Sequence, residues 1–231
     1  MALFAIADTH ISLSTGKSMA VFGGWSNYEE RLKKNWEAVV KPEDTVVIAG
    51  DVSWSLDMRE GLKDFQFLND LPGRKLLMKG NHDYWWSTKK KADAFFEENG
   101  LNTLHILHNN TYTEGQFAVC GTRGWFFDAE SDADRKVLLR EVGRLKMSIA
   151  AAKATGLEPV VFLHYPPITT LQKCDEIYDV LKEEGIRRCY YGHLHSYSHQ
   201  SAVNGWQDGI RFSLISADYT EFHPIPVYED R

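Results

Sequence analysis

The sequence has little of what marks secreted or membrane proteins. It contains only three cysteines in 231 residues, Cys120, Cys174 and Cys189, and no Cys-x-x-Cys pair. This scarcity argues against a disulfide framework or a thiolate zinc site and favours a reducing compartment. No apolar run approaches the roughly 20 residues that a membrane helix needs, and the N-terminus lacks the basic region of a signal peptide. We therefore expect a cytoplasmic protein that does not associate with a membrane.

The chain also lacks an excess of basic residues. It has 26 lysines and arginines against 32 aspartates and glutamates, which gives a formal net charge of −6. This balance argues against a general nucleic-acid binder, because such proteins need a basic face for the phosphates. No segment rich in proline, glycine and serine divides the chain, so we expect residues 1–231 to form a single domain.

Short apolar runs alternate with amphipathic runs along the whole chain, which predicts an α/β fold with mixed sheets. Asn27 and Glu30 predict a capping box at the first helix, Ser87 a cap at the third, and Ser131 with Asp134 the start of the long fourth helix. The expected strands cover residues 2–7, 45–49, 75–79, 103–107, 116–120, 159–163, 186–191 and 210–216, with 103–107 and 116–120 as a candidate pair. The expected helices cover residues 27–40, 57–68, 87–100, 131–155 and 175–184.

Polar side chains follow five of these strands at the point where each strand ends. Ligands in α/β sheets bind beyond the carboxyl ends of the strands, so we expect the five groups to meet in one crevice. Asp8 with His10, and His193 with His195, are two residues apart, a spacing that puts both side chains on one side of an extended chain. Glycine precedes three of the groups and allows a sharp backbone turn there. The groups are Asp8-Thr9-His10, Gly50-Asp51, Gly80-Asn81-His82-Asp83, His164 and Gly192-His193-Leu194-His195.

The donor atoms in these groups suit a divalent transition metal. They comprise carboxylates, imidazoles and one amide, with no thiolate, which fits Mn, Fe, Zn, Co or Ni better than calcium or a structural zinc. The Gly-Asn-His and Gly-His-x-His motifs each have a chance expectation of only about 0.025 in a chain of this composition. Their presence together, each after a predicted strand, therefore points to a metal site.

In this order the blocks Asp-x-His, Gly-Asp, Gly-Asn-His-Asp, His and Gly-His-x-His resemble the calcineurin-like metallophosphoesterases. The resemblance spans residues 8–195 and implies a four-layer sandwich of two mixed β-sheets flanked by helices. It implies two divalent metal ions and hydrolysis of a phosphodiester or phosphomonoester by a hydroxide that bridges them. The implied ligands are Asp8, His10 and His195 for one ion, Asn81, His164 and His193 for the other, and Asp51 between the two. His82 would be the catalytic histidine.

The sequence departs from two branches of that superfamily. In the protein Ser/Thr phosphatases, Gly-Asp is followed by a further Asp-Arg-Gly that supports the catalytic histidine. Here the run is Gly50-Asp51-Val52-Ser53-Trp54-Ser55. The lipid A precursor hydrolases usually have arginine where His82 stands. Both departures argue for another branch, acting on a small or medium-sized phosphate ester, and they leave open what orients His82, which Asp83 follows in sequence.

Two other functions remain as alternatives. One is a nuclease of the same superfamily, against which the acidic charge balance argues. The other is a non-catalytic metal-binding scaffold, against which the full ligand set and an intact His82 argue. The oligomeric state and the metal in the cell have no signal in the sequence.

Substrate contacts have weaker signals. Arg123 follows another predicted strand. Its guanidinium can donate two hydrogen bonds to a phosphate, or form a surface ion pair instead. His199 follows the last motif, and Trp25 belongs to a loop over residues 11–26, where it can stack on a substrate or pack in the core. We expect this loop and the segment 122–130 to shape the pocket.

Overall fold

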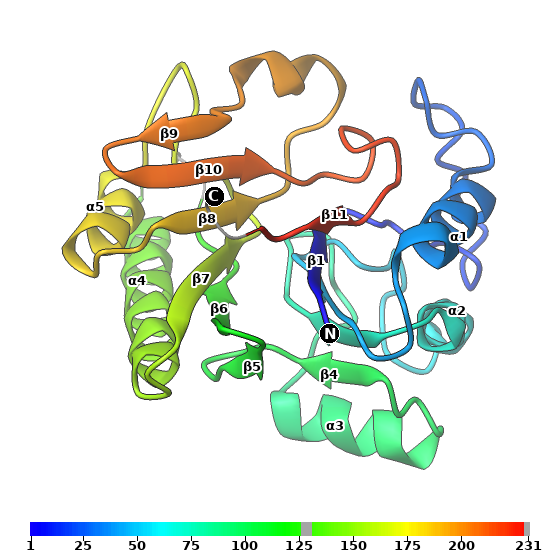
Figure 1. The fold of residues 1–231 in the computed structure, drawn as a ribbon. Helices are drawn as coiled ribbons and strands as arrows, with labels where there is room; N and C mark the ends of the chain where they lie inside the picture. Colours follow the sequence, from blue (N-terminus) through cyan, green and yellow to red (C-terminus); the bar gives the residue numbers. More distant parts are fainter. Residues whose placement is uncertain (126–130, 229–231) are drawn as a thin grey trace.

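The computed structural model describes residues 1–125 and 131–228, so residues 126–130 of the predicted pocket segment lie outside the described residues. Two sheets stack face to face with helices on their outer sides, which confirms the predicted α/β sandwich (Figure 1). The elements are, in chain order, β1 (Leu3–Ile6), α1 (Tyr28–Val39), β2 (Thr45–Ile48), α2 (Leu62–Asp70), β3 (Arg74–Leu77), α3 (Lys89–Glu98), β4 (Leu104–Ile106), β5 (Tyr112–Glu114), β6 (Phe117–Thr122), α4 (Asp132–Lys153), β7 (Glu158–Leu163), α5 (Asp175–Glu183), β8 (Arg188–Tyr191), the 3-10 helix η1 (Ser196–Ser201), β9 (Gly205–Gln207), β10 (Ile210–Leu214) and β11 (Ile225–Pro226).

Both sheets are mixed. The first has the order β11-β1-β2-β3-β4, with β1 to β4 parallel and β11 antiparallel at one edge. The second has the order β5-β6-β7-β8-β10-β9, with a parallel centre and antiparallel strands β5 and β9 at its edges. The parallel strands of each sheet therefore end at a common edge, where their polar continuations can meet.

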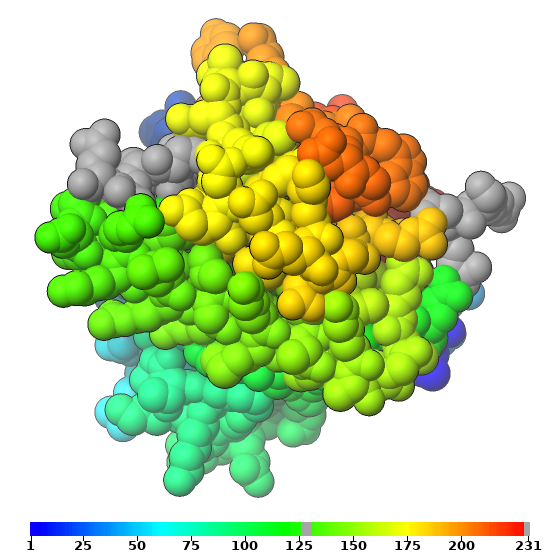
Figure 2. All heavy atoms as spheres, turned by 90° about the vertical axis from the view of Figure 1, so that its left-hand side faces the viewer, coloured from blue at the N-terminus to red at the C-terminus, as the bar shows by residue number. Residues whose placement is uncertain are grey.

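Successive side chains of β1 point to opposite faces of the first sheet, so this strand contributes to two hydrophobic cores. Leu3 and Ala5 pack into the core between the two sheets, while Phe4 and Ile6 pack into the core that contains buried residues of α1, α2 and α3. A third core joins the second sheet to α4 and α5, which cover much of the face shown in Figure 2. Strands buried on both faces read as continuous apolar runs, which is why these segments were recognisable in the sequence.

The two sheets are joined by backbone hydrogen bonds at one point. The amide of Ala7 donates to the carbonyl of Ile215 at 2.8 Å, and the amide of Ala217 donates to the carbonyl of Ala7 at 2.9 Å. This seam sets the end of β1 beside the end of β10. Asp8, the next residue, consequently faces side chains from both sheets.

Some local predictions were wrong. Asn27 lies in the left-handed region (φ 49°, ψ 37°) and caps no N–H with its side chain, so the predicted capping box is absent from α1. Thr88 rather than Ser87 caps α3, whereas the Ser131 capping box of α4 is confirmed. The second helix begins at Leu62 rather than residue 57.

The pairing expected between residues 103–107 and 116–120 is also wrong. These segments form β4 and β6, which belong to different sheets, and β6 pairs with β5 and β7 instead. Among the described helices, none combines the length and the apolarity needed to cross a bilayer.

Candidate metal centre

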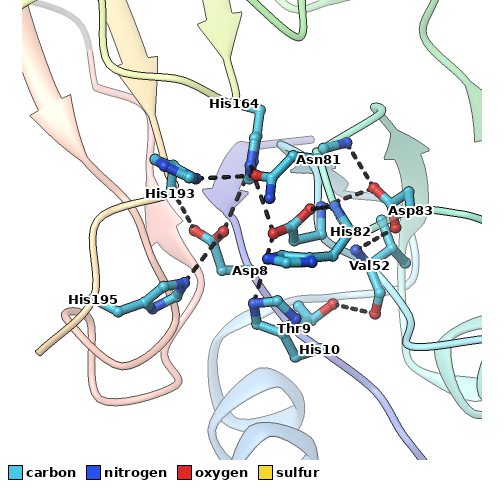
Figure 3. Close-up of polar contacts among 12 residues, drawn as sticks. Asp8, Thr9, His10, Val52, Asn81, His82, Asp83, His164, His193 and His195 are labelled. Atoms are coloured by element: carbon cyan, nitrogen blue, oxygen red, sulfur yellow. Dashed lines mark hydrogen bonds and ion pairs between the residues drawn. The ribbon is translucent and has the colours of Figure 1, made fainter. Parts of the chain in front are cut away.

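The predicted ligands converge at the carboxyl ends of the parallel strands of both sheets (Figure 3). The ligand atoms form two groups, in each of which every atom lies within 4.8 Å of the others. One group comprises Asp8, His10 and His195, and the other comprises Asp8, Asp51 and His164. Each group takes its aspartates from the first sheet and one histidine from the second, so the site forms only where the sheets meet.

Asp8 lies at the centre of the cluster and is completely buried. Its Oδ2 accepts the backbone N–H of His193 at 2.9 Å. Its Oδ1 lies 3.6 Å from Nε2 of His195 and 3.7 Å from Nδ1 of His164 but accepts no hydrogen bond from any residue that the structure describes. A buried carboxylate oxygen without a hydrogen bond costs free energy, and a cation coordinated there would remove that cost.

Lone pairs converge on the other side of the cluster. Nδ1 of His164 lies 3.2 Å from the carbonyl oxygen of Ala49, and because a carbonyl only accepts, Nδ1 carries the proton. Nε2 of a neutral His164 then presents a lone pair, yet it lies 2.6 Å from Oδ1 of Asn81 and 3.6 Å from Oδ2 of Asp51. Oδ1 of Asn81 also lies 3.0 Å from Nδ1 of His193. Hydrogen-bond acceptors gathered in this way are the kind of ligand atoms that coordinate a divalent cation.

The protonation equilibria fit the same interpretation. Burial lowers the pKa of His10 well below its usual value and that of His193 to about 3, so both imidazoles are neutral at pH 7. Burial alone would raise the pKa of Asp8, but the neighbouring imidazoles, led by His195, outweigh it and lower that pKa. Burial and the nearby Asp8 carboxylate raise the pKa of Asp51 to about 8. Neutral imidazoles such as those of His10 and His193 coordinate a metal ion directly, whereas Asp51 holds a proton at pH 7 that a bound cation would release.

The backbone at four of the predicted ligands is not extended, although that at His195 is, so the geometric reason given for the two-residue spacing was wrong. Asp8, His10, Asp51 and His193 all have left-handed backbones, with φ values from 45° to 71°. Left-handed backbone is uncommon outside glycine and costs about 1–3 kcal/mol where it is strained. The side chains meet because the chain turns sharply after each strand, and four ligands carry the cost of those turns.

Two glycines of the motifs are required for close approach rather than for turning. A Cβ on Gly80 would lie 2.1 Å from Oδ1 of Asp51, and a Cβ on Gly192 would lie 2.5 Å from Oδ2 of Asp8. Neither glycine has a positive φ. A side chain at Gly80 would therefore displace the carboxylate of Asp51, and a side chain at Gly192 would displace that of Asp8.

Asp83 organises the loops of the site. Its carboxylate accepts the backbone N–H groups of Gly80 (2.7 Å), Asp51 (2.8 Å) and Val52 (2.8 Å), and the indole N–H of Trp85 at 2.8 Å. All of these bonds are buried, and they tie the loop after β2 to the loop after β3. The carboxylate of Asp83 thus accepts hydrogen bonds from backbone N–H groups and from the Trp85 indole rather than from the ring of His82.

The ring of His82 is placed by an aromatic contact. The backbone N–H of His82 donates to Oδ1 of Asp51 at 2.8 Å, which fixes the loop, and its ring packs at 4.8 Å from the ring of Trp54. Trp54 also stacks on His10, with ring centroids 4.8 Å apart and planes 19° from parallel. Nδ1 of His82 is buried with no hydrogen-bond partner in the described chain. In a segment after Asp51 that lacks Asp-Arg-Gly, Trp54 thus contacts the ring of His82 by packing.

Sequence reasoning missed Asp218. Its Oδ1 lies 2.9 Å from Nδ1 of His195, and its Oδ2 lies 3.3 Å from Nε2 of His199. With Asp8, the Asp218 carboxylate outweighs burial and raises the pKa of His195 to about 10. Asp218 follows β10 just as the predicted ligands follow their strands, so the same rule would have found it.

A cavity of about 160 Å³ opens beside the cluster. It is lined by His10, Asp51, His82, His193, His195 and Ser196 on one side, and by Met19, Phe22, Trp25 and Trp54 on the other.

The three predicted substrate residues differ in their relation to this cavity. Trp25 lines it while being 2% exposed. Arg123 lies outside the lining, 3.9 Å from the carboxylate of Glu141, with its guanidinium 5.3 Å from the centroid of Trp125. His199 packs on Tyr219 at 5.2 Å and faces Asp218. Substrate contact by Arg123 and His199 stays a prediction.

The chain is similar to known proteins in sequence and in fold. The family model described as calcineurin-like phosphoesterase matches residues 1–197. The gene 66 protein of Mycobacterium phage L5 is 41% identical over 56 residues, a stretch that covers 24% of this chain and only 27% of that protein.

Two solved structures share the fold at 17% identity. A protein of unknown function from Aquifex aeolicus has a TM-score of 0.54, covering 97% of this chain and 95% of its own. A phosphopantetheinyl hydrolase from Mycobacterium tuberculosis has a TM-score of 0.53, covering 99% of this chain and 96% of its own.

Proposed function

Because the chain belongs to the calcineurin-like phosphoesterase family, we propose that it hydrolyses phosphodiesters with the help of two divalent cations. The observation that carries this proposal is the pair of ligand groups that share Asp8 at the seam of the two sheets. The fully buried Asp8 oxygen without a hydrogen bond supports it, since a cation would satisfy that atom.

The residues would divide between two ions. Asp8, His10 and His195 would hold one ion, and His164, Asn81 and His193 the other. Asp51 would lie between them, because its Oδ2 is 3.8 Å from His10 and 3.6 Å from His164. When bound, two divalent cations lower the pKa of water and neutralise phosphate oxygens, which permits in-line attack at phosphorus at neutral pH.

The protein residues would complete the reaction. His82 lines the cavity and belongs to neither ligand group. Burial lowers the pKa of its imidazole, but an anionic phosphate beside the ring would favour the protonated form, which would then donate a proton to the leaving oxygen. Asp83 keeps the loops that carry Asp51 and His82 in register through its bonds to their backbone. The apolar residues of the cavity wall would exclude water from the reacting groups.

A diester is favoured over a monoester by the cavity lining. Within residues 1–125 and 131–228, the residues that line the cavity include no lysine or arginine, and a monoester at pH 7 carries more negative charge than a diester. The relative from Mycobacterium tuberculosis is named for hydrolysis of a phosphopantetheinyl group. That likeness concerns the fold, so phosphopantetheinyl diesters are one candidate among others.

The proposal is tested with a bis-aryl phosphate and a mono-aryl phosphate after chelation and addition of Mn²⁺. We expect the diester to be hydrolysed faster, the activity to require Mn²⁺, and Asp51→Asn to lower it at least about 100-fold. The exposed Asp132, in the first turn of α4, provides the control substitution Asp132→Asn, which should have no effect. Faster hydrolysis of the monoester would overturn the diester assignment, and activity independent of metal would overturn the mechanism.

Asp218 gives a second prediction. A carboxylate that orients a ligand histidine through its second nitrogen typically raises metal affinity 10–100-fold. Asp218→Asn is therefore expected to weaken Mn²⁺ binding about 10–100-fold, measured by competition with a chelator of known affinity. Asp132→Asn should bind Mn²⁺ as tightly as the wild type. Equal affinity in both variants would show that Asp218 does not support His195.

A further inference from the structure

Apart from excluding water, one wall of the cavity has no role in the chemistry above. Met19, Phe22 and Trp25, from the loop over residues 11–26, face the ligand cluster together with Trp54. Phe22 is half exposed, whereas Met19 and Trp25 are 5% and 2% exposed. The wall thus runs from the buried floor of the cavity to its open mouth.

This apolar wall is held in place from behind. Trp25 packs edge-on against Tyr28 at 5.2 Å and against Phe222 at 5.1 Å. The indole N–H of Trp54 donates to the sulfur of Met19 at 3.2 Å, which pins the loop. Such support fixes the wall before any ligand arrives, and a preformed apolar surface binds a ligand without a large ordering cost.

Among the described residues, the side chains of this wall offer no hydrogen bond or opposite charge to an anionic group. Lys17 lies nearby, but its ammonium sits 3.2 Å from the centroid of Trp54 rather than in the cavity lining. A carboxylate or second phosphate placed against Met19, Phe22 and Trp25 would lose its water without gaining a partner. An uncharged apolar group would gain free energy from burial at the same place.

We propose that this wall binds an uncharged apolar substituent of the substrate, an aromatic ring or a short alkyl chain attached to the phosphate. The inference rests on the proposed function, because the ligand cluster would hold the phosphate beside the wall. The cavity of about 160 Å³ would also have to hold the phosphate, so only a compact substituent fits beside the wall. The substrate class is therefore a phosphate ester with a compact apolar group close to phosphorus.

Phosphonates test the wall without turnover, because they present one headgroup with different substituents. We would titrate the Mn²⁺-loaded protein with methylphosphonate, phenylphosphonate and 2-carboxyethylphosphonate in a calorimeter. Phenylphosphonate is expected to bind about tenfold more tightly than methylphosphonate and with a more negative heat-capacity change. The carboxyethyl compound should bind no more tightly than methylphosphonate.

Substitutions of Phe22 and Val21 test whether this wall causes the preference for phenylphosphonate. Phe22→Ala is expected to reduce the tenfold preference to about threefold or less, and Phe22→Leu to keep most of it. Val21, the preceding residue, is 79% exposed and outside the lining, so Val21→Ala should keep the full preference. A preference unchanged by Phe22→Ala would overturn the assignment to this wall.

Two further outcomes separate this inference from the proposed function. Equal affinities for methyl- and phenylphosphonate, with metal-dependent diester hydrolysis intact, would overturn the apolar wall alone. No phosphonate binding and no metal-dependent hydrolysis would overturn both proposals.

Discussion

Replacing His82 with alanine is expected to lower kcat for an aryl phosphodiester about 10²- to 10⁴-fold, the range for loss of a general acid or base. The ring lines the cavity, lies in neither metal-binding group, and has a buried Nδ1 without a hydrogen-bond partner in the described chain. Its loss should therefore leave the ligand set intact. Metal content measured on the purified variant should match that of the wild type.

The leaving group distinguishes catalysis from a structural role of His82. A proton donor matters most when the departing oxygen is basic, so the loss should be greater for a phenol ester than for a nitrophenol ester. Trp54→Leu provides a comparison, because it removes the ring that packs on His82 while keeping an apolar residue. An equal loss for both leaving groups in His82→Ala would contradict proton donation by His82.

The second large effect concerns stability. Asp83→Ala is expected to lower the free energy of unfolding by about 4 kcal/mol, because each buried donor left without an acceptor costs about 1–3 kcal/mol. The variant removes the acceptor of the N–H groups of Gly80, Asp51 and Val52 and of the indole of Trp85. Relaxation of the two loops relieves part of the sum of these costs.

Urea denaturation of the chelated protein measures this loss without a contribution from bound metal. Asp83→Asn keeps one acceptor oxygen and should lose about half as much free energy. Asp93→Ala on α3 removes only an ion pair with Lys89 at the surface and should change the free energy by less than about 1 kcal/mol. An unchanged midpoint in Asp83→Ala would refute the loop-organising role of Asp83.

The architecture and the position of the site could be predicted because both follow from strand patterns. Buried strands of parallel sheets are continuous apolar runs, and polar residues directly after them lie at one edge of the sheet. Asp8, Asp51 and His164 obey this rule, and they meet as expected. Asp218 obeys it too, but a lone aspartate after β10 belongs to no motif that draws attention to it.

Other features depended on contacts between distant segments. The strands β5, β9 and β11 have only two or three residues, too few to show a periodicity. The left-handed backbone at Asp8 and His10 has no neighbouring glycine that would indicate it in the sequence. The packing of Trp54 on His82 needs residues 54 and 82 to be placed by two different loops, which no local pattern specifies.

The division of the ligands between two sheets has a consequence for cooperativity. Each metal-binding group joins aspartates after β1 or β2 to a histidine after β7 or β8, across the backbone bonds at Ala7. An ion bound there would link the two sheets, and it would raise the free energy of unfolding because ligand binding to the native state alone adds to its stability by mass action. Chelation should accelerate amide hydrogen exchange first at Ala7 and Ala217, while the centres of both sheets stay protected. The ions would thus add a second connection, at the strand ends, between two sheets that already share one core.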